Sequence, residues 1–231
     1  MQHDISAVLD ELDRRIARRS ILQHPFYQAW TAGELSREQL ATYAALYYPH
    51  VEAFPEYLRT AAAGTEDAVI RAELLDNLRE EESEPVAHPQ LWLDFAQGLG
   101  LEPEQVAQAP ACASTAATVR AFHELCATGT TEAVTALYAY ESQQPEVAAT
   151  KADGLCRFYG IEDEATVRYF EVHTEADVRH RQGERDAIAR CLAQGATPEQ
   201  VLSAADRALD AYWQLLDGVC EATGIETQMV C

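Results

Sequence analysis

The chain has little positive charge and almost no lysine. Its 231 residues include 17 lysines and arginines against 38 aspartates and glutamates, which gives a formal net charge of −21. Because nucleic-acid binding depends on basic side chains that neutralise phosphates, this balance excludes nucleic acid as a main partner. Lys151 is the single lysine. A site that needs a primary amine able to lose its proton is one explanation for its presence, and chance is the other.

Paired cysteine motifs and long apolar segments are also missing. The six cysteines are scattered without a C-x-x-C pair, which is typical of reduced thiols in a cytoplasm. The first residues, MQHDISAVLDELDRR, lack the apolar core of a signal peptide. No segment approaches the roughly 20 apolar residues that are needed to cross a bilayer. We therefore expect a soluble, cytoplasmic protein that does not enter a membrane.

No stretch alternates between polar and apolar residues as a β-strand does. Apolar residues instead recur at spacings of three and four, as in QLATYAALYYPHV and VLSAADRALDAYWQLL. This pattern predicts an all-α fold with helices at residues 4–19, 25–32, 37–62, 66–83, 89–98, 114–127, 131–158, 163–194 and 198–223. Pro49, Pro55 and Pro145 fall inside these ranges, where each removes a backbone hydrogen bond and tends to kink the axis. Without a linker or an internal repeat, residues 1–231 are expected to form one domain.

The segment from Tyr169 to His180 carries the clearest chemical pattern. His173, Asp177 and His180 are separated by four and then three residues, so they fall within about a 60° sector of one helix face. Neutral imidazoles and carboxylates are ligands that iron, manganese and zinc share, so this face supplies half of a candidate metal site. The alternative is a histidine pair whose hydrogen bonds are satisfied by Asp177 and backbone carbonyls.

A second candidate contribution is His88, which follows the acidic run NLREEESEPVA. Glu81 lies seven residues before His88 and Glu84 lies four before it, with Pro85 interrupting the helix between them. Spacing alone does not choose between the two carboxylates. The ordinary alternative for such a run is a solvated acidic surface.

A third candidate is Glu141, which ends the otherwise apolar stretch AVTALYAYE. Burying an ionised carboxylate there without a partner costs on the order of several kcal/mol. A metal ion would keep it charged, and so would an arginine partner. Three histidines and three carboxylates on separate helices of one bundle would supply a dinuclear site, with carboxylates available to bridge.

Several segments carry a family resemblance. They are HPFYQAW at 24–30, FPEYL at 54–58, HPQLWLDFAQGLG at 88–100 and YESQQP at 140–145. Together with the candidate ligands, they resemble the family of the chlamydial protein associating with death domains. That family lies among the heme-oxygenase-like dimetal oxidases, whose wider fold includes thiaminase II and pyrroloquinoline-quinone synthase. The resemblance runs from LDELD to the last predicted helix, and it implies a heme-oxygenase-like bundle of about seven helices.

The resemblance also implies two metal ions, either two irons or a manganese and an iron, together with O2 and an external reductant. It matches Glu81 rather than Glu84 to the first carboxylate ligand. The implied ligands are Glu81, His88, Glu141, His173, Asp177 and His180. A homodimer is compatible with the family likeness.

The reaction that the resemblance implies makes p-aminobenzoate for folate synthesis by O2-dependent excision of one of the protein's own tyrosine side chains. The matching tyrosine is Tyr27, and the amino donor matches Lys151. Tyr43 and Tyr140 also match, and they could relay electrons or hydrogen atoms as tyrosyl radicals. The ordinary alternatives are buried core tyrosines and a surface amine whose stem lies along the protein.

Three other functions remain open from the sequence. A dimetal oxygenase that acts on an external fatty acid or amino acid predicts an open apolar pocket and multiple turnovers. A metal-free hydrolase in the manner of thiaminase II would leave the six ligands without a purpose. A non-enzymatic helical binding module, with an acidic surface for a basic or death-domain partner, predicts no stoichiometric metal.

Overall fold

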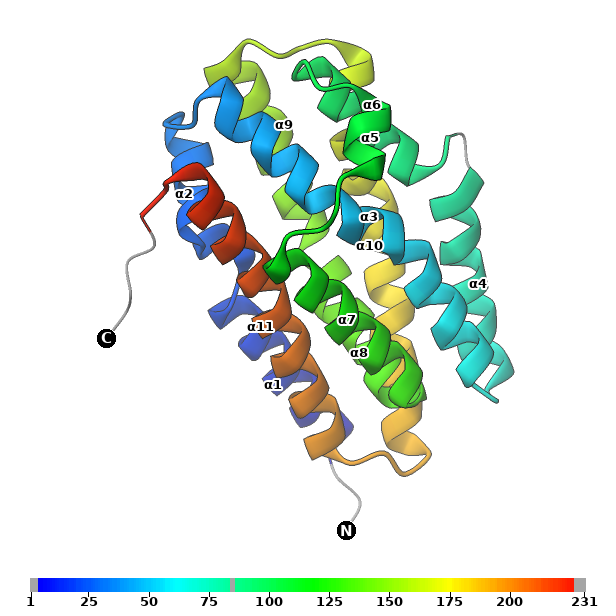
Figure 1. The fold of residues 1–231 in the computed structure, drawn as a ribbon. Helices are drawn as coiled ribbons and strands as arrows, with labels where there is room; N and C mark the ends of the chain where they lie inside the picture. Colours follow the sequence, from blue (N-terminus) through cyan, green and yellow to red (C-terminus); the bar gives the residue numbers. More distant parts are fainter. Residues whose placement is uncertain (1–3, 84–85, 227–231) are drawn as a thin grey trace.

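A computed structural model describes residues 4–83 and 86–226 of the chain. All regular elements within these residues are helical, which confirms the all-α prediction (Figure 1). The elements are α1 (Ile5–Arg18), η1 (Ile21–Gln23), α2 (Pro25–Ala32), α3 (Arg37–Gly64), α4 (Ala68–Ser83), α5 (His88–Gly98), α6 (Pro103–Gln108), α7 (Ala113–Thr128), α8 (Thr130–Glu141), α9 (Gln144–Tyr159), α10 (Glu164–Ala193) and α11 (Pro198–Thr223). None of these described helices is long and apolar enough to cross a membrane.

Local sequence signals fix the starts of two long helices. At the start of α3, Ser36 accepts a hydrogen bond from the backbone N–H of Gln39, and the Gln39 side chain accepts one from the backbone N–H of Ser36. Thr197 and Gln200 make the same reciprocal pair at the start of α11. Such capping boxes satisfy backbone donors that the first turn leaves without partners.

The single helix predicted for residues 131–158 is wrong. The structure has two helices there, because α8 ends at Glu141 and α9 begins at Gln144. Pro145 has no N–H to donate to the carbonyl of Glu141, four residues earlier, so the first helix stops and Pro145 lies in the first turn of the second. Pro49 and Pro55 do lie inside a helix, α3, as predicted. The short α6 was not predicted.

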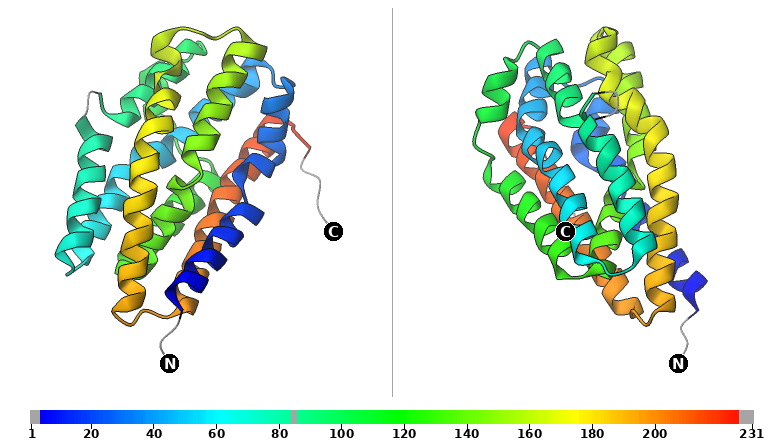
Figure 2. Two further views of the ribbon diagram at one scale, coloured as in Figure 1. Left: turned by 180° about the vertical axis from the view of Figure 1, so that it is seen from behind. Right: turned by 90° about the vertical axis from the view of Figure 1, so that its right-hand side faces the viewer.

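The long helix α10 positions the candidate site. It packs against α4, α5, α8 and α9, and these helices carry the other candidate ligands and Lys151. Figure 2 shows α10, in yellow to orange, running along most of the bundle. On the other side of the molecule, α3, α7 and α11 pack against one another. The fold therefore brings two consecutive pairs of helices, α4 with α5 and α8 with α9, to a single helix.

The interior is rich in aromatic side chains. The largest fully buried side chains include Trp30, Trp92, several tyrosines and several phenylalanines. Lys151 is the one cationic member of that set among the described residues, and 2% of its surface is exposed. A lysine at this depth is unusual, because burial disfavours its charged form.

Candidate metal centre and the tyrosines beside it

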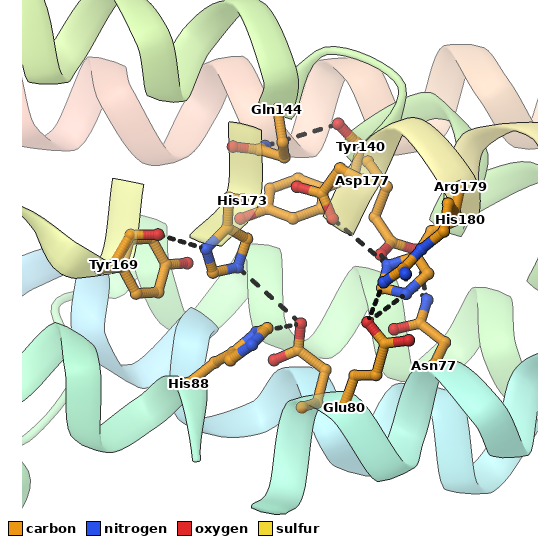
Figure 3. Close-up of polar contacts among 12 residues, drawn as sticks. Asn77, Glu80, His88, Tyr140, Gln144, Tyr169, His173, Asp177, Arg179 and His180 are labelled. Atoms are coloured by element: carbon orange, nitrogen blue, oxygen red, sulfur yellow. Dashed lines mark hydrogen bonds and ion pairs between the residues drawn. The ribbon is translucent and has the colours of Figure 1, made fainter. Parts of the chain in front are cut away.

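The structure brings the six predicted metal ligands into two groups of three. Within each group the ligand atoms lie within 4.8 Å of one another. Figure 3 shows His173, Asp177 and His180 on α10 facing His88 and Glu80 from α5 and α4. The first group is Glu81, His88 and His173, and the second is Glu141, Asp177 and His180. Glu84, the alternative carboxylate, lies outside the described residues.

The first group is centred on the Glu81 carboxylate. Its Oε1 lies 2.8 Å from Nδ1 of His88 and 3.9 Å from Nε2 of His173. Nδ1 of His173 donates to the backbone carbonyl of Tyr169 at 2.6 Å, which leaves Nε2 as the nitrogen with a free lone pair. Burial holds the pKa of His173 well below its usual range, so the ring is neutral, as a metal ligand must be.

The second group contains two carboxylates and one imidazole. Nδ1 of His180 lies 3.4 Å from Oε1 of Glu141 and 3.4 Å from Oδ1 of Asp177. The amide of Asn77 donates to both oxygens of Glu141, at 3.0 and 3.1 Å. Nε2 of His180 lies 3.3 Å from Oε2 of Glu80. Asn77 and Glu80 therefore orient two ligands from outside the group, as supporting residues do around metal ions.

Sequence reasoning did not single out Asn77 or Glu80. Asn77 precedes Glu81 by four residues, so the two share one face of α4. This spacing could have identified Asn77 as a residue near the ligands. Glu80 lies on the neighbouring face, and only the approach of α10 gives it a partner.

Several buried atoms in this region have no hydrogen-bond partner among the described residues. They include Oδ2 of Asp177 and both ring nitrogens of His180. Burial raises the pKa of Asp177 to about 7, and the neighbouring Glu141 carboxylate contributes to the shift. Carboxylates gathered in a dry interior repel one another, and cations bound between them would remove this cost. The donor atoms are nitrogen and oxygen, which suit iron and manganese. The residues present therefore fit a pair of metal ions.

Lys151 lies in a cage of aromatic rings. Its Nζ is 5.3 Å from the ring centroid of Tyr27. Four further ring centroids lie at 5.4 to 5.5 Å from Nζ, those of Tyr43, Tyr47, Trp92 and Phe170. Burial lowers the pKa of Lys151 to about 7, so the neutral amine is well populated near neutral pH. The surface-amine interpretation of Lys151 is therefore wrong.

Hydroxyl groups link the Tyr27 region to the metal-ligand groups. The Tyr27 and Tyr43 hydroxyls are 3.1 Å apart, and the Tyr47 and Tyr140 hydroxyls are 3.0 Å apart. The rings of Tyr43 and Tyr47 are neighbours, with centroids 5.3 Å apart. Tyr140 lines a small cavity together with Glu81, Glu141, Tyr169, His173 and Asp177. The tyrosines thus form a continuous path from Tyr27 to the ligands.

Comparison with known proteins decides the family. Residues 41–213 match the sequence profile of a family described as iron-containing redox enzymes. The chain belongs to this family. All six candidate ligands, Lys151, Tyr43 and Tyr140 fall inside the matched range, and Tyr27 precedes it. The expectation that this protein is an enzyme is thereby confirmed.

Curated relatives of this enzyme cover nearly all of the chain. A 4-aminobenzoate synthase of Nitrosomonas europaea is 41% identical over 221 residues, which cover 91% of this chain and 90% of that protein. A 4-aminobenzoate synthase of Chlamydia trachomatis serovar D is 38% identical over 210 residues, which cover 90% of each protein. The predicted resemblance to the chlamydial family is therefore confirmed.

The fold of this redox enzyme also has a solved counterpart. A domain with a heme oxygenase-like fold from Shewanella denitrificans superposes with a TM-score of 0.73, at 14% sequence identity. The superposition covers 96% of this chain and 94% of that domain. The heme-oxygenase-like fold predicted from the resemblance is confirmed.

Proposed function

We propose that this enzyme makes p-aminobenzoate from its own Tyr27 in an O2-dependent reaction, with Lys151 as the amino donor. The observation that carries the proposal is the position of the single lysine, whose Nζ lies 5.3 Å from the Tyr27 ring inside a closed aromatic cage. Relatives that are named 4-aminobenzoate synthases support the product.

Two metal ions, held by the six residues of the two ligand groups, fit this reaction. When bound, a pair of irons or a manganese and an iron would reduce O2 with electrons from an external reductant and supply the oxidising equivalents for the excision. His88 and His173 would bind one ion with Glu81, and the three residues of the second group would bind the other.

The chain's own residues prepare Tyr27 and the amine. Burial raises the pKa of Tyr27 well above its usual range, so the phenol keeps its proton until it is oxidised. The hydroxyl of Tyr43, at 3.1 Å, is positioned to accept that proton or pass on a hydrogen atom. Tyr140 borders the ligands, so the tyrosine path can carry the oxidising equivalent from the ligands to Tyr27. Lys151 meets the oxidised ring as a neutral amine with a free lone pair.

The alternative with an external substrate requires space beside the metals. The cavity between the two ligand groups measures about 10 Å3, which is room for a single water molecule. A larger cavity of about 250 Å3 borders the second group, but charged side chains line much of it. Neither matches the open apolar pocket that a fatty acid would need. The buried ligand groups also argue against a metal-free hydrolase and against a simple binding module.

The test is a single-turnover reaction followed by mass spectrometry. Apo protein is loaded anaerobically with Fe(II), or with Fe(II) and Mn(II), then given a reductant and exposed to O2. We expect at most one p-aminobenzoate per chain and a loss of mass in the peptide that contains Tyr27. More than one p-aminobenzoate per chain, with the protein mass unchanged, would instead establish an external substrate.

Variants separate the roles of the residues. Tyr27→Phe and Lys151→Arg should bind metal and give no product. Tyr140→Phe should lower the yield by about tenfold or more, as expected for loss of a relay that acts in the transition state. Tyr138→Phe is the matched control, because the Tyr138 hydroxyl donates to Asp13 on the other side of α8. Equal yields from the Tyr140 and Tyr138 variants would remove Tyr140 from the path.

A further inference from the structure

The cavity of about 250 Å3 lies directly beside the second ligand group. His180, Asn77 and Glu80 line its inner side, and the exposed Glu73 lies on its rim. Gly183 also lines it, and a side chain at this position would meet the Glu73 carboxylate at 2.8 Å. The absence of a side chain at Gly183 therefore helps to keep the cavity open.

Glu184 also lines this cavity, and it is a buried acidic residue. Only 6% of the residue is exposed. Neither carboxyl oxygen has a hydrogen-bond partner, and Glu184 makes no ion pair, within the part of the chain that the structure describes. A buried acid without a partner destabilises the fold unless something binds it.

The position of Glu184 on α10 connects it with the ligands. It follows His180 by four residues, so His173, Asp177, His180 and Glu184 recur at spacings of four, three and four along one helix face. Glu184 also touches Glu141, a member of the second group from a different helix. It lies outside the compact group of three, and it lines the cavity together with His180.

We propose that Glu184 is a third carboxylate ligand of the metal ion at the second group, on the side of that group that faces the cavity. This inference rests on the dinuclear centre of the proposed function. The second ion would then have three carboxylates and one imidazole, whereas the first has one carboxylate and two imidazoles. Carboxylate-rich sites suit manganese better than imidazole-rich sites do. With Glu184 as a ligand, the second group would therefore suit manganese better than the first group.

The experiment is a titration of apo protein with Mn(II) alone, followed by the electron paramagnetic resonance signal of the free ion. Wild-type protein should bind two ions per chain. Glu184→Gln should bind one ion with unchanged affinity and the other about tenfold or more weakly, because loss of a ligand or of its support weakens metal binding by at least this factor. This readout does not depend on catalysis.

Glu73→Gln is the matched control, because it removes a carboxylate from the exposed rim of the same cavity. It should bind two ions as the wild type does. Circular dichroism checks folding, and Glu184→Met is titrated in the same way if the glutamine variant does not fold. If the folded Glu184 variant binds both Mn(II) ions with wild-type affinity, Glu184 is not a ligand, and the dinuclear centre itself is unaffected. Failure of the wild type to bind two ions would overturn the dinuclear centre itself.

Discussion

Lys151 is a buried amine without a carboxylate partner among the described residues. Aromatic rings surround its amine, and burial brings its pKa from 10.5 to about 7. Ring faces attract an ammonium group, but this attraction replaces only part of its lost hydration. The charged form of Lys151 therefore lowers the stability of the folded protein. A cost of this kind at a single residue is typical of functional sites.

The cost of Lys151 predicts a pH-dependent stability difference. Below about pH 7 the folded protein must bury the charged amine, so Lys151→Met should be more stable than the wild type at pH 6, by on the order of 5 kcal/mol. Between pH 7 and 10.5 the folded state has released this proton while the unfolded state still holds it, so wild-type stability rises with pH. The advantage of the variant should shrink accordingly.

Chemical denaturation of both proteins between pH 6 and 9, without added metal, measures this difference. Other titrating groups are common to both proteins and cancel in the comparison. A difference that stays constant with pH would show that the fold does not perturb Lys151.

At the scale of secondary-structure elements, the break between α8 and α9 decides how Glu141 and Lys151 are placed relative to each other. Glu141 ends α8, and Lys151 lies two turns into α9, so the ligand and the amine belong to helices with different axes. Had the predicted continuous helix existed, the two would have been separated by about 15 Å along one axis and turned to different faces. Pro145 was recognised in the sequence as a source of a kink, but the complete interruption of the helix was not.

Close packing of α9 against α2 sets the distance between Lys151 and Tyr27. Gly154 lies three residues after Lys151, and Trp30 lies three residues after Tyr27. A Cβ atom at Gly154 would lie 2.5 Å from Nε1 of Trp30. Gly154→Ala should therefore destabilise the protein by about 1–3 kcal/mol through overpacking, and it should lower the p-aminobenzoate yield by separating the two helices.

Gly64→Ala provides the comparison, because a Cβ at Gly64 in α3 would have no neighbour within 4 Å. Its stability should be equal to or slightly above that of the wild type. Urea denaturation and the single-turnover yield measure both variants. Wild-type stability in Gly154→Ala would show that α2 and α9 can move apart without cost.

At the scale of the whole molecule, the proposed metal centre joins distant parts of the bundle. Its ligands come from α4, α5, α8 and α10, so bound ions would cross-link four helices that the unfolded chain does not hold together. An ion that binds only the folded state stabilises it in proportion to the logarithm of its concentration. The buried carboxylates that repel one another in the absence of metal add to this dependence.

Removal of metal should therefore lower the Tm. With free Mn(II) at 100 times its Kd, each site should contribute about 2.7 kcal/mol of stability. Thermal unfolding with Mn(II), and again after excess chelator, measures the change. The double variant Glu81→Gln/Glu141→Gln should show no metal-dependent rise. A Tm that does not respond to Mn(II) in the wild type would contradict metal binding at these groups.

The alignment of site residues along one helix could be predicted from the sequence, because it depends only on their spacing in that helix. The alignment of His173, Asp177 and His180 follows from 3.6 residues per turn, and Glu184 extends the same series. The boundaries of α2 and α11 also agree with those predicted, since proline and capping residues mark them locally. The choice of Glu81 over Glu84 came only from the family resemblance, because spacing allowed both.

The sequence by itself determined that the fold is helical and where most of the helices begin and end. It also showed that the chain has a single lysine. Only the tertiary structure decided which helices meet, and thus that Asn77 supports Glu141, that Glu184 faces a cavity, and that aromatic rings enclose Lys151. The physical reason is that helix formation follows from neighbours within four residues, whereas these contacts depend on how side chains far apart in the chain fill a shared interior.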